Sequence, residues 1–96
     1  MAWRIEFLPV AEKELARLDR PFVQRILAFL DQRVRSLSDP RAIGEALVGK
    51  EFGKFWKYRV GDYRLICSIE DRRVLVTVVR VAHRSGVHRS KGRPER

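Results

Sequence analysis

Residues 50–64, KEFGKFWKYRVGDYR, alternate aromatic and basic side chains up to a two-residue turn, Gly61-Asp62. Because side chains along a β-strand point alternately to opposite faces, this pattern predicts a strand with one apolar and one cationic face. The apolar face carries Trp56, Tyr58 and Val60. The opposite face carries Lys57 and Arg59, and Arg64 joins it after the turn. Glycine at such a turn is typical of a β-hairpin, so the stretch predicts two paired strands whose exposed face would hold an anion.

Further strands are expected on both sides of this stretch. The hairpin itself is expected to pair Phe55–Val60 with Tyr63–Glu70. A third strand is expected at Val74–Ala82, where a nearly continuous run of apolar and β-branched residues is typical of a central strand. Residues 3–7, WRIEF, alternate apolar and charged side chains and predict a half-buried N-terminal strand.

Two amphipathic helices are expected between the N-terminal strand and the hairpin. Residues 9–18 place apolar side chains on one stripe and begin with a proline, which suits the first turn of a helix. A second helix follows the break at Asp19-Arg20-Pro21, since apolar residues recur at three- and four-residue steps from Val23 to Leu37. The short link favours an antiparallel helical hairpin, and residues 41–49 are expected to form a connector.

These elements predict an α+β fold in which both helices pack on one face of the sheet. The expected order is an N-terminal strand, a two-helix antiparallel hairpin and a three-stranded antiparallel meander. Ninety-six residues suffice for one hydrophobic core. Residues 1–89 are therefore expected to form a single domain, and residues 90–96 a flexible basic tail.

The chain is strongly basic, and its charge is uneven. Its 21 Lys and Arg exceed its 12 Asp and Glu, which gives a net charge of +9. Residues 1–49 hold 8 basic against 7 acidic side chains, whereas residues 50–96 hold 13 against 5. Such a balance indicates nucleic acid, an acidic protein or an anionic membrane as a partner. Arg exceeds Lys by 16 to 5, which favours phosphate binding over a merely solvated surface, because a guanidinium can bind phosphate through two hydrogen bonds.

Neither a membrane segment nor a disulfide is expected. Charges at Arg4 and Glu6 interrupt any N-terminal apolar run of the signal-peptide kind, and the run Val74–Val79 is too short to span a bilayer. Cys67 is the only cysteine, so it has no partner for an internal disulfide and is expected to be a small buried hydrophobe. We therefore expect a soluble, cytoplasmic protein.

Residues that could carry chemistry lie beside the predicted cationic face. Arg84 follows the third meander strand within reach of that face, and His83 and His88 flank this exit. Aromatic side chains beside the cations could stack on bases. Alternation instead assigns most of them to the core, and only Phe55 shares the basic face.

No metal site or cofactor is expected. Two histidines without a carboxylate cluster do not match a zinc-ligand spacing, and the chain contains no Gly-rich phosphate loop or Ser-His-Asp arrangement. Cations, histidine and lysine suit the metal-independent attack of an RNA 2′-hydroxyl on the adjacent phosphate. That reaction needs a phosphate anchor, stabilisation of extra negative charge, an acid and a base.

Three motifs, together with the predicted order of elements, resemble the RelE/ParE superfamily of bacterial toxins. The motifs are Leu47-Val48-Gly49, Trp56-Lys57-Tyr58-Arg59-Val60-Gly61-Asp62-Tyr63-Arg64 and Val81-Ala82-His83-Arg84. The likeness extends to about Arg89. It implies a toxin of a type II toxin–antitoxin system. It further implies that RelE-like members enter the ribosomal A site and cleave mRNA there, and that a cognate antitoxin wraps and silences them.

The resemblance also implies roles for single residues. In RelE-like toxins the basic positions matched by Lys57, Arg59, Arg64 and Arg84 hold the substrate phosphate and stabilise the transition state, and the first is a candidate base. His88 falls where many members have a tyrosine, and it could act as an acid or base. The predicted catalytic set is Lys57, Arg64, Arg84 and His88, and the predicted RNA-binding set is Lys50, Lys54, Arg59, His83 and Arg89.

Three functions are compatible with this resemblance. The first is a ribosome-dependent mRNA endonuclease that inhibits translation, with the ribosome, mRNA and an acidic antitoxin bearing a helical segment as partners. The second is a ParE-like toxin that poisons DNA gyrase without nuclease chemistry. The third is an inactive module that only binds an antitoxin. The full basic set favours the first, because ParE-like members generally lack it.

Overall fold

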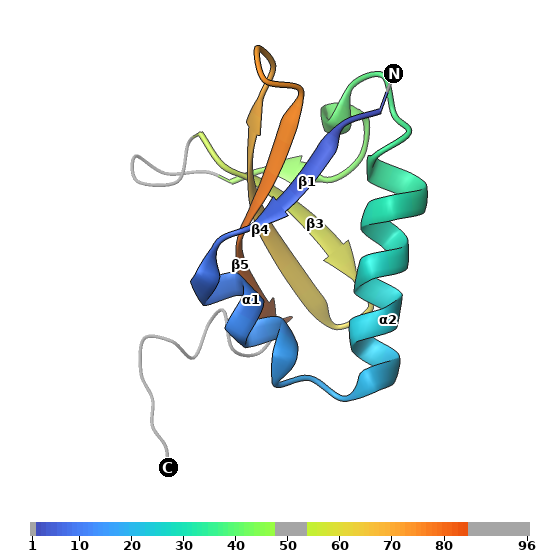
Figure 1. Ribbon diagram of the computed structural model, residues 1–96, viewed down its shortest axis with the longest axis vertical. Coiled ribbons are helices and arrows are strands. Elements are labelled where there is room, and N and C mark those ends of the chain that lie inside the picture. The colour runs from blue at the N-terminus through green and yellow to red at the C-terminus, as the bar shows by residue number, and fades with distance from the viewer. Residues whose placement is uncertain (1, 48–53, 85–96) are drawn as a thin grey trace.

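The computed structural model describes residues 2–47 and 54–84 of the chain (Figure 1). In chain order its elements are β1 (Arg4–Phe7), α1 (Pro9–Ala16), α2 (Arg20–Phe29), η1 (Leu30–Val34), η2 (Pro40–Ala42), β2 (Glu45–Ala46), β3 (Trp56–Val60), β4 (Tyr63–Glu70) and β5 (Leu75–His83). The predicted α+β class and order of elements are confirmed, with one additional strand.

The five strands form one mixed sheet in the order β1-β5-β4-β3-β2. β4 pairs antiparallel with both β3 and β5, as the predicted meander requires, and β1 pairs with β5 in parallel. β5 therefore lies between β1 and β4. This confirms the central position expected from its run of apolar and β-branched residues.

The additional strand is β2, which pairs with the edge of β3. The prediction of a plain connector over residues 41–49 is therefore wrong in part, because a two-residue strand is too short to show alternation. Gly44, with φ of 82°, lets the two strands approach: a Cβ there would lie 2.6 Å from the Lys57 carbonyl oxygen. Close by, Nε1 of Trp56 donates a hydrogen bond to the Ile43 carbonyl at 2.7 Å.

The two helices run antiparallel, as predicted (Figure 1). α1 begins at the predicted proline and ends two residues before the expected limit, Leu18. α2 begins at Arg20 and continues into the π-helical turn η1, which closes when the N–H of Arg35 donates to the Leu30 carbonyl at 2.9 Å. Of the described helices, none has the length and apolar character needed to cross a membrane.

A single hydrophobic core joins both helices to the sheet. Its buried side chains include Ala11, Leu15, Ile26, Leu30, Val34, Tyr58, Leu65, Cys67, Val76 and Val78. Along β4, Leu65 and Cys67 are buried and Ile66 between them is half-buried, so Leu65 and Cys67 face the core. Cys67 is fully buried, as expected, and burial raises the pKa of its thiol. It is therefore a packing residue.

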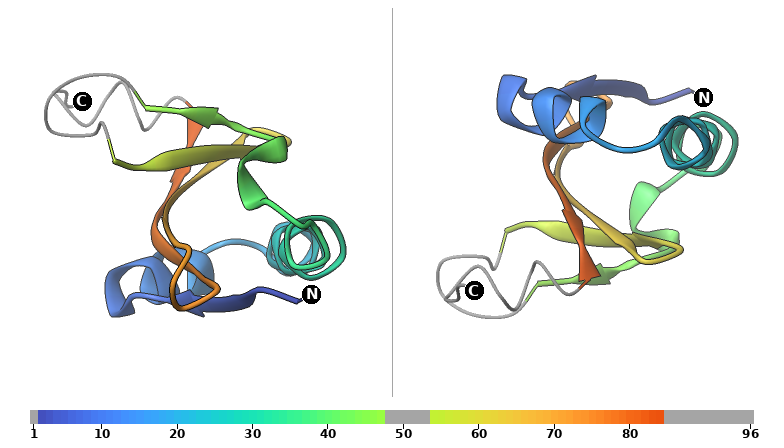
Figure 2. Two further views of the ribbon diagram at one scale, coloured as in Figure 1. Left: turned by 90° about the horizontal axis from the view of Figure 1, so that it is seen from above. Right: turned by 90° about the horizontal axis from the view of Figure 1, so that it is seen from below.

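The sheet is strongly twisted and bends around the side on which α2 lies, while α1 packs beside β5 (Figure 2).

Two arginines connect segments of this fold that are far apart in the sequence. Where β5 extends beyond β1, Glu14 of α1 accepts hydrogen bonds from the Val81 N–H at 2.7 Å and from Nη2 of Arg80 at 2.6 Å. Near η2, Arg41 donates two hydrogen bonds of 3.1 Å to the carboxylate of Asp71.

Candidate anion-binding site

The exposed face of the β3–β4 hairpin carries the cations that the sequence predicts there. Strand register places Arg59 directly opposite Arg64, and Lys57 lies two residues back along β3, about 6.6 Å away along the strand. The neighbours of these residues in sequence include the buried Tyr58, Val60 and Leu65. The three cations therefore lie on the face away from the core. Like charges directly opposite each other destabilise a sheet, so folding alone does not explain the Arg59–Arg64 pair.

A carboxylate lies among these cations. Glu45 of β2 is paired in register with Lys57, whose Nζ lies 2.9 Å from Oε2 of Glu45. The hydrogen bond from Lys57 and its charge, together with the charges of Arg59 and Arg64, hold the pKa of Glu45 below its ordinary value of 4.5. One carboxylate thus feels all three cations. Sequence reasoning missed Glu45 because it lies in the segment expected to be a connector.

Arg84 is brought to the turn of the same hairpin. It directly follows β5, and its N–H donates a hydrogen bond to the Asp62 carbonyl at 2.6 Å, while its Nη1 lies 3.7 Å from Oδ1 of Asp62. Arg64 pairs in register with Ala82, two residues before Arg84. Arg64 and Arg84 therefore lie near one turn, and Lys57 lies further from the turn along β3. Their catalytic roles stay predictions.

His83 lies on the helix side of the sheet. It pairs in register with Tyr63, and the two rings meet edge to face with their centroids 5.2 Å apart. Tyr63 in turn packs against Phe22 of α2, with ring centroids 5.4 Å apart. The structure thus places His83 on the opposite side from the Arg59–Arg64 pair, and its part in RNA binding stays a prediction.

The remaining predicted site residues are only partly described. Lys54 is exposed just before β3, and Phe55 beside it is half-buried. Lys50, His88, Arg89 and the expected tail at residues 90–96 lie outside the described residues. Within residues 2–47 and 54–84, no three His, Cys, Asp or Glu side chains come together as metal ligands would. The described side chains offer one ammonium and three guanidinium groups, from Lys57, Arg59, Arg64 and Arg84, against the two carboxylates of Glu45 and Asp62. This excess of cationic donors is suited to binding an anion.

Comparison with known proteins identifies the family. Residues 5–88 match the family model described as the ParE toxin of the type II toxin–antitoxin system parDE. A search of curated proteins finds no match. Because the family model spans most of the chain, it supports the superfamily resemblance drawn from the sequence motifs.

Solved structures of RelE toxins share the fold. The toxin–antitoxin complex RelBE2 from Mycobacterium tuberculosis matches with a TM-score of 0.78 and 25% identity, covering 88% of this chain and 94% of that one. The intact RelBE complex of E. coli matches with a TM-score of 0.68 and 24% identity, covering 99% and 100% of the two chains. The isolated E. coli RelE toxin gives 0.67 and 24%, with coverage of 94% and 95%. The chain therefore belongs to the ParE toxins of type II toxin–antitoxin systems, within the RelE/ParE superfamily.

Proposed function

We propose that this toxin is a RelE-like endoribonuclease that cleaves mRNA on the ribosome, in the cytoplasm, and so inhibits translation. The observation that carries the proposal is the Arg59–Arg64 pair, which lies beside Lys57 on an exposed face of the sheet. Two like charges held opposite each other disfavour folding, whereas a bound phosphate would neutralise both through charge-assisted hydrogen bonds. Cations also occupy all four positions that the RelE-like motif associates with the substrate phosphate.

In the proposed reaction the RNA cleaves itself with help from these side chains. The ribose 2′-oxygen forms a bond to the adjacent phosphorus, and the bond from phosphorus to the 5′-oxygen breaks. The products are a 2′,3′-cyclic phosphate and a 5′-hydroxyl. A base accepts the 2′-hydroxyl proton, and an acid returns a proton to the leaving 5′-oxygen. Arg64 and Arg84 stabilise the extra negative charge on the phosphate oxygens, and Arg59 positions the RNA.

The proton acceptor is assigned to the pair formed by Glu45 and Lys57, with His88 as the second candidate from the sequence. Glu45 is ionised at neutral pH because its pKa lies below 4.5, and Lys57 lies within hydrogen-bond distance of it. If Glu45 accepts the proton, Glu45→Gln should slow single-turnover cleavage by about 10²-fold. An unchanged rate in Glu45→Gln, with a loss in Lys57→Gln or His88→Gln, would assign the base to that residue instead.

A cognate antitoxin is proposed as the partner that silences the toxin. Two of the similar structures are complexes of a RelE toxin with its RelB antitoxin. The net charge of +9 of this chain suits an acidic partner segment. We expect the antitoxin to be an acidic protein that contributes a helical segment.

Induced expression in bacteria tests the activity. Primer extension should show new 5′ ends within translated mRNA soon after induction, and these ends should be lost in Arg64→Ala and in Arg84→Ala. Arg72→Ala is the matched control, because this exposed arginine lies in the β4–β5 turn and not in the proposed site. Intact mRNA in growth-arrested cells would overturn the nuclease proposal.

A second candidate function is inhibition of DNA gyrase, which the description of the matching family as ParE favours. The same induced cultures decide between the two. Double-strand DNA breaks with intact mRNA would establish gyrase poisoning, and cleaved mRNA with intact DNA would exclude it. Growth that is unaffected by expression would indicate an inactive antitoxin-binding module.

A further inference from the structure

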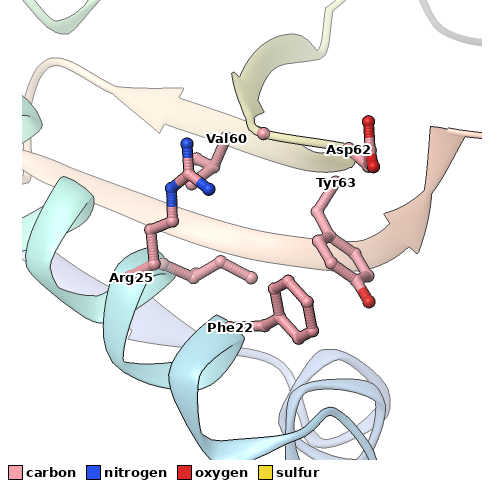
Figure 3. Close-up of a pocket in the computed structure, with 7 residues that line it drawn as sticks. Phe22, Arg25, Val60, Asp62 and Tyr63 are labelled. Atoms are coloured by element: carbon pink, nitrogen blue, oxygen red, sulfur yellow. The ribbon is translucent and has the colours of Figure 1, made fainter.

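A cleft runs between α2 and the tip of the β3–β4 hairpin, on the side of the sheet away from Lys57. It consists of two adjoining hollows of about 250 and 320 Å³. Arg25, Val60 and Gly61 line both hollows, and Figure 3 shows Arg25 in the smaller one together with Phe22 and Tyr63. Phe22 and Tyr63 line the smaller hollow, and Arg33 and Arg59 line the larger.

Gly61 sets the position of Arg25. A Cβ on Gly61 would lie 3.1 Å from Nη1 and 3.3 Å from Cζ of Arg25, so the guanidinium lies directly over the turn. Any side chain at residue 61 would press on that guanidinium, and the φ of +60° also favours glycine there. One glycine therefore shapes the turn and leaves room for the arginine above it.

The larger hollow is strongly cationic. Its lining includes three arginines, Arg25 of α2, Arg33 of η1 and Arg59 of β3, and contains no acidic residue. None of the three forms an ion pair with a carboxylate of the described residues. Arg33 lies over the ring of Phe29, with Cζ 5.8 Å from the ring centroid. The Arg59 side chain belongs to the opposite face of β3, so Arg25 and Arg33 are the guanidinium groups that this hollow offers. Two such groups without a carboxylate in the hollow's lining are suited to binding a phosphate.

We propose that this cleft is a second nucleic-acid subsite, in which Arg25 and Arg33 bind a backbone phosphate of single-stranded RNA and the Phe22–Tyr63 rings receive a base. The proposal rests on the proposed function, since it extends the path of the substrate. Arg59 connects the two sites: it is paired with Arg64 on the exposed face of the hairpin and also lines the cleft. An RNA strand on that face would therefore continue around the hairpin edge toward α2.

The shape of the cleft favours RNA over a protein helix. An α-helix with side chains is about 10–12 Å wide, and it needs a continuous groove, whereas this cleft consists of two small hollows. An alternation of cations with aromatic rings suits single-stranded nucleic acid, whose phosphates and bases alternate. Phe22 is 39% exposed, which leaves its ring accessible for stacking.

Direct binding of an uncleavable RNA tests the subsite apart from the reaction. The probe is a fluorescent single-stranded oligonucleotide with 2′-O-methyl groups, which has no 2′-hydroxyl to attack the phosphate, and binding is followed by anisotropy across a range of salt concentrations. The double variant Arg25→Gln with Arg33→Gln should bind at least 10-fold more weakly at low salt. Its plot of log affinity against log salt should be less steep by about 0.7, the change expected for one lost phosphate contact on a single strand.

Matched variants separate the subsite from general charge. Lys13→Gln with Arg72→Gln removes the same charge from exposed positions outside the cleft and should bind nearly as wild type does. Phe22→Leu should weaken binding by about 5- to 150-fold, the loss expected for one base–aromatic stack, without changing the salt slope. The Arg25→Lys, Arg33→Lys variant should recover the slope. Circular dichroism confirms that each variant is folded.

The outcomes distinguish this proposal from the endonuclease proposal. If the Arg25→Gln, Arg33→Gln variant and the Lys13→Gln, Arg72→Gln control lose equal RNA affinity, the subsite proposal is overturned. The endonuclease proposal would then still be supported by mRNA cleavage in cells. A wild-type protein that binds an acidic peptide but not the oligonucleotide would also overturn the subsite proposal. Loss of binding confined to the cleft variants would support the subsite, and Arg64→Ala should then still show the contribution of Arg25 and Arg33 to the salt slope.

Discussion

Two pairs of arginines in this protein use the same side chain in opposite ways. Arg41 and Arg80 each donate two hydrogen bonds to a single carboxylate, and each joins segments far apart in the chain. Arg59 and Arg64 instead lie opposite each other on neighbouring strands. Neither forms an ion pair with any carboxylate in the part of the chain that the structure describes.

The difference separates charges that serve the fold from charges available to a ligand. Hydrogen bonds to Glu14 raise the pKa of Arg80, and those to Asp71 raise the pKa of Arg41, so both charges are stabilised within the folded chain. The Arg59–Arg64 pair differs, because each positive charge raises the electrostatic energy of the other in the folded chain. The net charge of the chain does not separate these two kinds of arginine, because each of the four arginines adds one positive charge to it.

The largest effect is expected from removing one arginine of the exposed pair. Arg64→Ala should lower the rate of RNA cleavage by about 10²- to 10³-fold, or about 2.7–4 kcal/mol of transition-state stabilisation. Thermal unfolding should be unaffected or shift slightly upward, because one repulsion is removed. Cleavage in a reconstituted translation reaction measures the rate. A variant as active as Arg72→Ala would contradict the assignment of Arg64.

Removing the partner of a paired arginine should instead destabilise the fold. Glu14→Ala leaves the Val81 N–H and the Arg80 guanidinium without their acceptor, which should lower the free energy of unfolding by about 1–3 kcal/mol. Urea denaturation measures this change. Glu12→Ala, an exposed acidic residue on the same helix, serves as the control and should stay within about 0.5 kcal/mol of wild type. Equal stability of the two variants would show that the pairing contributes nothing.

The same carboxylate should make stability depend on acid pH. Partial burial raises the pKa of Glu14, but the hydrogen bonds from Arg80 and the Val81 N–H outweigh it, and the pKa lies below 4.5. The unfolded chain therefore takes up the proton first, and the stabilisation is lost as pH falls below about 4.5 through the folded pKa. Thermal melts from pH 7 to pH 3 should show the gap between wild type and Glu14→Gln closing in acid. A gap that widens would reverse the sign of the linkage.

The smallest effect is the change in stability expected when the repulsion between Arg59 and Arg64 is removed. Arg59→Thr removes the repulsion with Arg64 and places a β-branched residue in a strand, so it should stabilise the protein by about 0.2–1 kcal/mol. Arg80→Thr should move stability the other way, because it breaks the contacts with Glu14. Differential scanning calorimetry compares the two. If both variants lose stability alike, the contrast between the two arginine pairs does not hold.

Much of the exposed cationic face is predictable because strand geometry leaves few alternatives. Burial of Tyr58 and Val60 forces Lys57 and Arg59 to the opposite face of β3. The two-residue turn then places Val60 opposite Tyr63, and the next pair outward is Arg59 with Arg64. A one-residue shift in this register would reverse the face of every side chain on the strand. Pattern and turn together therefore determine the arrangement.

The contacts that pattern alone does not reveal are those between distant segments. Glu14 and Arg80 are 66 residues apart in sequence, and their pairing depends on where α1 crosses β5. The strand β2 is too short to show alternation, so Glu45 was missed. The cleft was missed as well, because the position of Arg25 over Gly61 depends on how α2 docks on the hairpin. Such positions follow from packing and not from local periodicity.

The Glu45–Lys57 contact places a competing anion within the cationic face itself. The Glu45 carboxylate lies among the cations where a phosphate group would bind. A small anion that binds there must therefore weaken the ion pair between Glu45 and Lys57. Acid that neutralises Glu45 removes this competitor and should tighten the binding of an inert oxyanion such as sulfate. Weaker sulfate binding on acidification would mean that the carboxylate assists anions instead of competing with them.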